Sequence, residues 1–145
     1  MKKVLVIHNT YRNSGGEDVA VNNEIALLER HYQVESIFFT NQNIDLFSLV
    51  GFISSSNYKS NRILKKKLNK FNPDIVYVHN TWFNASLGIF KVLKKRKIKT
   101  VIKLHNFRYR CTNTFFSSTH IGEDSHCFSC GLTKKDVGVF NKYFI

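Results

Sequence analysis

The chain has 145 residues, of which 43% are hydrophobic and 22% charged, the balance of an ordinary globular domain. This composition excludes wholesale disorder, a collagenous fibre and a small disulfide-stabilised protein. The net charge of +12 comes from the middle of the chain, because residues 59–110 carry 15 basic side chains and a single acid. A polyanion is therefore an expected partner: nucleic acid, an anionic lipid surface or a phosphorylated substrate.

The N-terminal apolar run over residues 4–7 is too short for the core of a signal peptide, and no small-residue cleavage site follows it. The longest apolar runs of the chain also fall short of the ~20 residues that a membrane-spanning helix needs. The sequence therefore predicts a cytoplasmic protein.

Short β-branched runs alternate with amphipathic stretches along the first 105 residues. In chain order, the pattern predicts strands and helices as follows: strand 3–7, loop 8–16, helix 18–31, strand 33–39, helix 60–71, strand 75–78, helix 86–97 and strand 100–104. Residues 44–53 fit a short helix or a loop. The first helix places Val21, Ile25 and Leu28 on one apolar face. This alternation predicts an α/β fold with a parallel sheet and right-handed crossovers.

A histidine–asparagine pair follows three of the predicted strands: His8-Asn9, His79-Asn80 and His105-Asn106. In a parallel sheet these pairs lie along the carboxyl edge, where α/β proteins bind ligands. Imidazole can act as an acid or a base near neutral pH, and amides suit a ligand rich in hydroxyl groups. Each histidine could instead be bonded to a backbone carbonyl inside the core. We expect the three pairs to meet at one water-accessible rim.

Two glycines, Gly15 and Gly16, lie between the first strand and the first helix. Glycines there let a ligand approach the backbone, and free amides at a helix start attract phosphate. An ordinary tight turn is an equal alternative, and the acidic Glu17 and Asp18 oppose a strong anion site. The segment is neither a dinucleotide-binding fingerprint nor a P-loop.

Three cysteines, Cys111, Cys127 and Cys130, form a C-x15-C-x2-C pattern. A C-x2-C pair is a common half of a structural zinc site. His120 or His126 could supply a fourth ligand, and His120 is the better candidate because His126 adjoins Cys127. Free thiols, or a site completed by residues outside this sequence, are the alternatives.

The two helices predicted over 60–71 and 86–97 have basic outer faces without balancing acids. Such faces are often only solvated exteriors. They also suit an anionic bilayer surface. Nucleic acid fits the charge equally, although no nucleic-acid-binding motif is present.

Several segments together resemble the N-terminal domain of bacterial glycosyltransferase family-four proteins, which have the GT-B architecture. These are KKVLVIHNTYRNSGGED at 2–18, NPDIVYVHNTW at 72–82, and LHNFRYRC at 104–111 with CFSC at 127–130. The resemblance covers nearly the whole chain. It implies a Rossmann-like domain that binds the acceptor sugar, while a second domain binds the nucleotide-sugar.

The resemblance also implies roles for individual residues. His105 would be the catalytic residue near the transferred sugar. Gly15 and Gly16 would approach the donor diphosphate or the acceptor, and Asn80, Asn106 and Arg108 would bind substrate. Transfer would retain the anomeric configuration and need no metal or other cofactor for chemistry. The acceptor would be a glycan or a lipid-linked glycan of surface polysaccharide synthesis.

The chain resembles one lobe only, because no counterpart of the nucleotide-sugar-binding lobe is evident. We therefore expect one domain over 1–145, with a cysteine-containing loop at about 107–132, that does not turn over a nucleotide-sugar alone. Two other readings stay open. The first is a non-catalytic partner that recruits a split transferase to the inner face of the membrane, and the second is a zinc-containing nucleic-acid binder.

Overall fold

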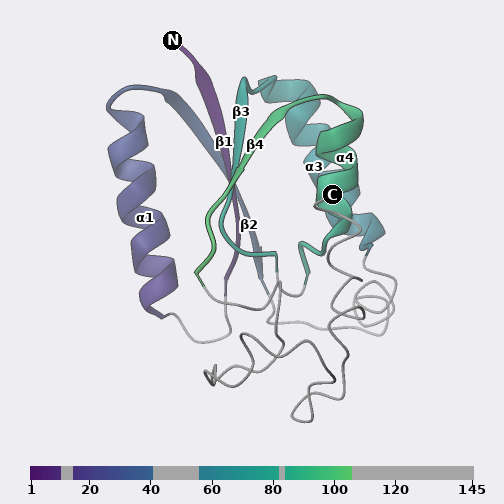
Figure 1. Cartoon of the computed structure of the whole chain (residues 1–145), viewed down its shortest axis with the longest axis horizontal. Coiled ribbons are helices and arrows are strands. Elements are labelled where there is room, and N and C mark those ends of the chain that lie inside the picture. The colour runs from purple at the N-terminus through teal and green to yellow at the C-terminus, as the bar shows by residue number, and fades with distance from the viewer. Residues whose placement is uncertain (11–14, 41–55, 82–83, 106–145) are drawn as a thin grey trace, which may run out of the picture. The chain divides into compact units, whose positions relative to one another are not determined.

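The computed structural model describes residues 1–10, 15–40, 56–81 and 84–105, which are drawn in colour in Figure 1. The chain divides into two compact units, Met1–Lys103 and Leu104–Ile145. The described helices and strands all belong to the first unit, and of the second only residues 104 and 105 are described.

Helices and strands of the first unit alternate in the predicted order. They are β1 (Lys3–Thr10), α1 (Gly16–Glu29), β2 (Gln33–Thr40), α3 (Tyr58–Phe71), β3 (Ile75–Val78), α4 (Gly88–Lys95) and β4 (Lys99–Ile102). The four strands form one parallel sheet in the order β2-β1-β3-β4. The predicted α/β class is confirmed, and the fold is Rossmann-like.

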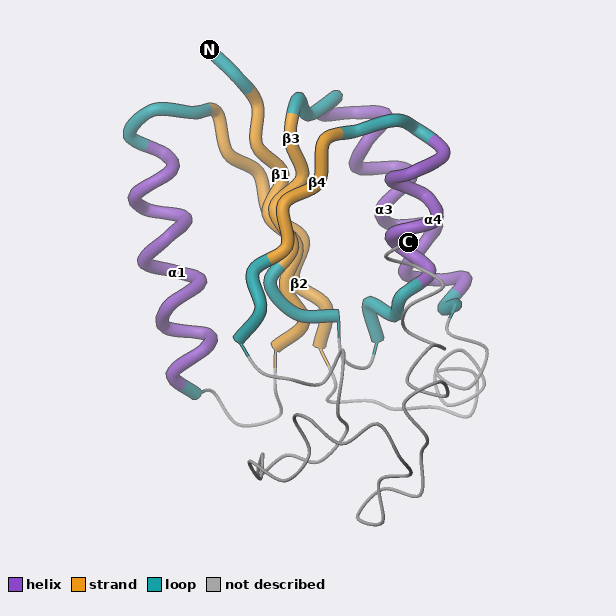
Figure 2. The backbone as a smooth tube through the Cα atoms, viewed as in Figure 1, coloured by secondary structure: helices purple, strands orange, loops and turns teal. Residues whose placement is uncertain are grey.

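Helices cover both faces of the sheet, with α1 on one side and α3 and α4 together on the other (Figure 2). Alternate residues of a strand point to opposite faces, so β1 serves both layers. Val4 and Val6 pack with Val21 of α1, and the predicted apolar face of that helix is confirmed because Ile25 and Leu28 join this cluster. The intervening residues of β1 face α3 and α4 and are fully buried.

The strand β1 is longer than predicted, because the expected loop over 8–16 begins only after Thr10. Its pairing with β2 continues through His8 opposite Phe38, Asn9 opposite Phe39 and Thr10 opposite Thr40. The two polar residues His8 and Asn9 therefore belong to the sheet. Their side chains point to opposite layers instead of into a loop.

The helix α4 is shorter than the predicted 86–97 because left-handed backbone brackets it. Ser86 has φ 57° and Lys97 has φ 54°, values that an α-helix cannot contain. The helix α3 begins two residues earlier than predicted, where the Asn57 side chain accepts the Ser60 N–H at 3.2 Å. The uncertain stretch 44–53 lies outside the described residues.

Among the helices of the described residues, none combines the length and the apolar character that crossing a bilayer requires.

Candidate functional site

Two of the three histidine–asparagine pairs meet at the carboxyl edge of the sheet. His8-Asn9 ends the central strand β1, and His79-Asn80 directly follows its neighbour β3. The His79 N–H donates to the Ile7 carbonyl at 2.9 Å, which extends the ladder past β3. The prediction that these two pairs converge on one edge is confirmed.

The expectation that these pairs are open to water is wrong for both of them. His8 and Asn9 are 0% exposed, His79 is 2% exposed and Asn80 is 6% exposed. The physical reason is that the fold packs around them, and His8 Nε2, Asn9 Oδ1 and Asn80 Nδ2 each bond to a neighbouring part of the fold. These four side chains therefore form no exposed sugar-binding rim.

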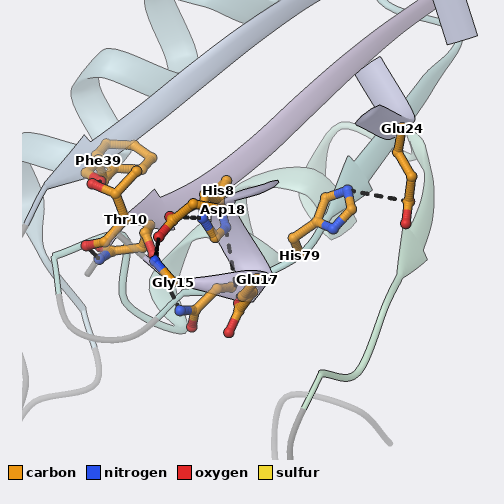
Figure 3. Close-up of polar contacts among 10 residues, drawn as sticks. His8, Thr10, Gly15, Glu17, Asp18, Glu24, Phe39 and His79 are labelled. Atoms are coloured by element: carbon orange, nitrogen blue, oxygen red, sulfur yellow. Dashed lines mark hydrogen bonds and ion pairs between the residues drawn. The ribbon is translucent and has the colours of Figure 1, made fainter. Parts of the chain in front are cut away.

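His8 is bonded to a carboxylate instead of the backbone carbonyl that a buried histidine commonly finds. Its Nε2 lies 2.8 Å from Oδ1 of Asp18, and Oδ2 of Asp18 accepts the Gly15 N–H at 2.8 Å (Figure 3). One carboxylate thus joins the end of β1 to the glycine that caps α1. This contact fixes the start of α1 against the end of β1.

A second carboxylate approaches the other ring nitrogen of His8. Glu17 Oε1 lies 4.0 Å from His8 Nδ1, and within the described residues neither atom has a hydrogen-bond partner (Figure 3). Both acids stand in the first turn of α1, where the helix dipole favours negative charge. The start of α1 therefore already carries carboxylates of its own, which opposes the binding of a phosphate there.

The side chain of Asn9 points to the face of the sheet opposite His8, and both Asn9 and Asn80 make hydrogen bonds within the fold. Asn9 Oδ1 accepts the Ala85 N–H at 3.0 Å, which ties β1 to the residues before α4. Asn80 Nδ2 donates to the Asn9 carbonyl at 3.1 Å. This bond gives Asn80 a position in the fold, and its predicted contact with substrate stays a prediction.

Gly15 and Gly16 differ from the buried pairs because both are exposed. Among the described residues, a Cβ atom added at either position would meet no other atom within 4 Å. Gly15 has an extended backbone with φ −131°, which any residue adopts. The diglycine turn is thus an accessible segment of backbone at the carboxyl edge, and no described neighbour requires glycine there.

Sequence reasoning missed a polar cluster on the α1 side of the sheet. Tyr77 donates its O–H to Glu24 Oε2 at 2.7 Å, and Lys103 donates to Glu24 Oε1. His79 Nε2 lies 3.8 Å from Glu24 Oε2 (Figure 3). The available signal was periodicity: Glu24 follows Val21 by one helical turn, and Tyr77 points away from its buried neighbours Val76 and Val78.

Burial and hydrogen bonding act in opposite directions on Glu24. Burial alone would raise the pKa of this carboxyl, but hydrogen bonds from Lys103 and Tyr77 and the positive charge of Lys103 outweigh it and lower the pKa below 4.5. Burial, together with the hydrogen bond to the same carboxylate and its charge, raises the pKa of Tyr77. Glu24 is therefore charged at neutral pH and fastens α1 to β3 and to the residue after β4.

Replacing Glu24 with glutamine should lower the stability of the protein by an amount that depends on pH. Because the pKa of Glu24 is lower in the folded state, its contribution is present above the unfolded pKa and disappears as the pH falls through the folded pKa. We expect E24Q to lower the free energy of unfolding by about 1 kcal/mol near pH 7 and by much less near pH 3. Urea unfolding at both pH values measures this difference.

Glu29→Gln is the matched control for this experiment. Glu29 is exposed near the end of the same helix and makes no ion pair within the described residues. Its substitution should change the unfolding free energy by less than about 0.5 kcal/mol at either pH. A difference for E24Q that stays constant with pH would contradict the assigned ionisation.

The remaining predicted residues belong to the second unit. His105 belongs to the second unit, and five predicted positions lie outside the described residues: Asn106, Arg108, Cys111, Cys127 and Cys130. Within the described ranges, no group of three histidine, cysteine or acidic side chains is placed to hold a metal ion. The catalytic, substrate-binding and zinc assignments of these residues stay predictions.

The fold and the site define the first unit as a Rossmann-like α/β domain with an exposed diglycine turn at the carboxyl edge of its sheet. Comparison with known proteins found no matching family model, no matching curated protein and no matching solved structure.

Proposed function

We propose that the chain is the acceptor-binding domain of a glycosyltransferase. It would serve an enzyme that moves a sugar from a nucleotide-sugar to a glycan or lipid-linked acceptor in surface polysaccharide synthesis. The observation that carries the proposal is the exposed diglycine turn after β1, because α/β domains bind their ligands at this edge of a parallel sheet. The family-four-like segments 2–18 and 72–82, which contain β1 and β3, support it.

The glycines themselves argue for a ligand. Neither position has a described neighbour that a methyl group would strike, so crowding by the described residues does not explain the glycines. Glycine also costs conformational entropy on folding, and at the first helical position alanine is the better helix former. A ligand that approaches the backbone closely would explain why glycine occupies both positions.

The negative charge beside the diglycine turn favours one kind of ligand over another. Glu17 and Asp18 place two carboxylates in the first turn of α1, and Asp18 already accepts the Gly15 N–H. Carboxylates repel a diphosphate and accept hydrogen bonds from hydroxyl groups. Of the two ligands expected here, the hydroxyl-rich acceptor therefore suits this turn better than the donor diphosphate.

The buried polar residues have a positioning role in this proposal. His8 holds Asp18, and Asp18 holds Gly15 at the edge of the sheet. With Gly15 held in this way, its backbone needs no further ordering when a ligand arrives, which lowers the cost of binding.

Alanine substitutions in the turn test the proposal. We expect the chain to bind soluble glycans or short-chain polyprenyl-diphosphate-linked sugars, measured by titration calorimetry against a panel that includes nucleotide-sugars. G15A and G16A should weaken acceptor binding by about tenfold, because the added methyl group occupies the approach to the backbone. Both variants should keep the unfolding free energy within about 1 kcal/mol of the parent.

Gly88→Ala is the opposite control. A Cβ atom at Gly88 would stand 2.8 Å from Ser56 Oγ and 2.9 Å from Asn61 Nδ2, so this variant should lose stability and keep acceptor affinity. If G15A and G16A leave the binding of every acceptor unchanged, the assignment of the turn is wrong. Absence of binding to the whole acceptor panel would overturn the proposed function.

A further inference from the structure

The outer surface of the α3–α4 layer is basic and contains no acid. The segment of α3 carries six basic residues and that of α4 carries three, and neither helix contains an aspartate or a glutamate. The two helices lie side by side on one face of the sheet (Figure 1). Six exposed side chains define what we call the α3–α4 basic face: Arg62, Lys65, Lys66, Lys70, Lys94 and Lys95.

Among the described residues, no acidic side chain neutralises the charges of this face. Lys67, at the side of α3, pairs with Glu35 of β2 at 2.6 Å. Within the part of the chain that the structure describes, no carboxylate lies within ion-pair distance of the six residues of the α3–α4 basic face. The positive side chains on such a helix repel one another, and a negatively charged partner removes this repulsion.

Exposed apolar side chains accompany the charges on α3. Tyr58 is 80% exposed at the start of the helix, and Ile63 is 41% exposed beside Arg62. Tyrosine is enriched where a bilayer meets water, and aliphatic side chains gain from insertion at the same depth. Lysine and arginine stems reach from that depth to the headgroups.

We propose that the α3–α4 basic face docks on the surface of an anionic lipid bilayer. The side chains of α3 and α4 that supply the positive charge lie in one helical layer, and Tyr58 and Ile63 add apolar contact that a phosphate backbone does not use. The described basic face also lacks an interleaved row of aromatic side chains on which bases stack. A bilayer therefore fits this surface better than a nucleic acid.

Sedimentation with lipid vesicles tests the docking surface. We expect the full chain to bind vesicles that contain phosphatidylglycerol, to release them as the salt concentration rises, and to ignore vesicles of phosphatidylcholine alone. Arg62→Glu combined with Lys66→Glu should lower the partition coefficient by at least about tenfold, since each basic residue near an anionic surface contributes and each new acid repels.

A charge-matched variant separates the surface from the net charge. Lys2→Glu combined with Arg30→Glu changes the net charge equally, at exposed residues outside α3 and α4, and should alter the partition coefficient by less than about twofold. Tyr58→Ser should weaken the binding that remains at high salt. Equal losses in both charge variants, or no binding to anionic vesicles, would overturn the proposal.

Nucleic acid is tested in the same series. If a single-stranded oligonucleotide binds through Arg62 and Lys66 while anionic vesicles do not bind, the surface is a nucleic-acid site and the membrane proposal is wrong. The vesicles carry no glycan, so this result is independent of the proposed acceptor site. If both proposals hold, the acceptor is expected to be lipid-linked.

Discussion

Asp18→Ala should destabilise the protein by about 3 kcal/mol, the largest loss that we expect from a polar substitution. The change removes the partner of His8 Nε2, which is fully buried, and at the same time releases the Gly15 N–H. A buried polar group that loses its partner retains the cost of its desolvation. Chemical denaturation monitored by circular dichroism measures the change.

Glu17→Ala is the control for this experiment. Glu17 stands in the same turn of α1 and approaches His8 only to 4.0 Å, so its removal should cost less than about 1 kcal/mol. Asp18→Asn should fall between the two variants, because its remaining oxygen can still accept one of the two hydrogen bonds. If D18A and E17A have the same stability, the contact between Asp18, His8 and Gly15 does not fasten the turn.

Asn9→Ala should cost about 2 kcal/mol through the opposite face of the same strand. Asn9 is fully buried, and its side-chain oxygen accepts the Ala85 N–H at 3.0 Å. Alanine leaves that N–H unpaired and opens a small cavity between β1 and the residues before α4. The loss should appear as a lower urea midpoint with an unchanged dependence on urea concentration.

Asn22→Ala gives the comparison for Asn9, because Asn22 is exposed on α1. Alanine is the better helix former, so this variant should be as stable as the parent or slightly more stable. A cost for N9A below about 0.5 kcal/mol would show that the Ala85 N–H finds another partner.

The order of helices and strands was predictable because apolar periodicity decides it. The β1 run and the apolar face of α1 around Val21 each have one favourable placement in a parallel sheet. The ends of the elements were less predictable, because pairing with β2 carries β1 through Thr10 and left-handed backbone at Ser86 and Lys97 shortens α4. Such effects arise from tertiary contacts and lie outside a local pattern.

The candidate site was predictable in its location but not in its chemistry. Strand ends in a parallel sheet meet by topology, so the convergence of His8 and His79 follows from the sequence. Whether a polar side chain faces water or the core depends on partners that are distant in the chain. Asp18 captures His8 across ten positions, and Glu24 meets Tyr77 across 53.

Two polar side chains of β1, those of His8 and Asn9, are bonded inside the fold, which affects how a ligand can be recognised at this edge. With the His8 and Asn9 side chains engaged internally, a ligand that reaches Gly15 and Gly16 meets main-chain atoms that carry no side chain. Discrimination at Gly15 and Gly16 themselves would then depend on contour and on main-chain geometry. Ligand preference could consequently be altered by remodelling the turn as a whole more readily than by exchanging any one functional group within it.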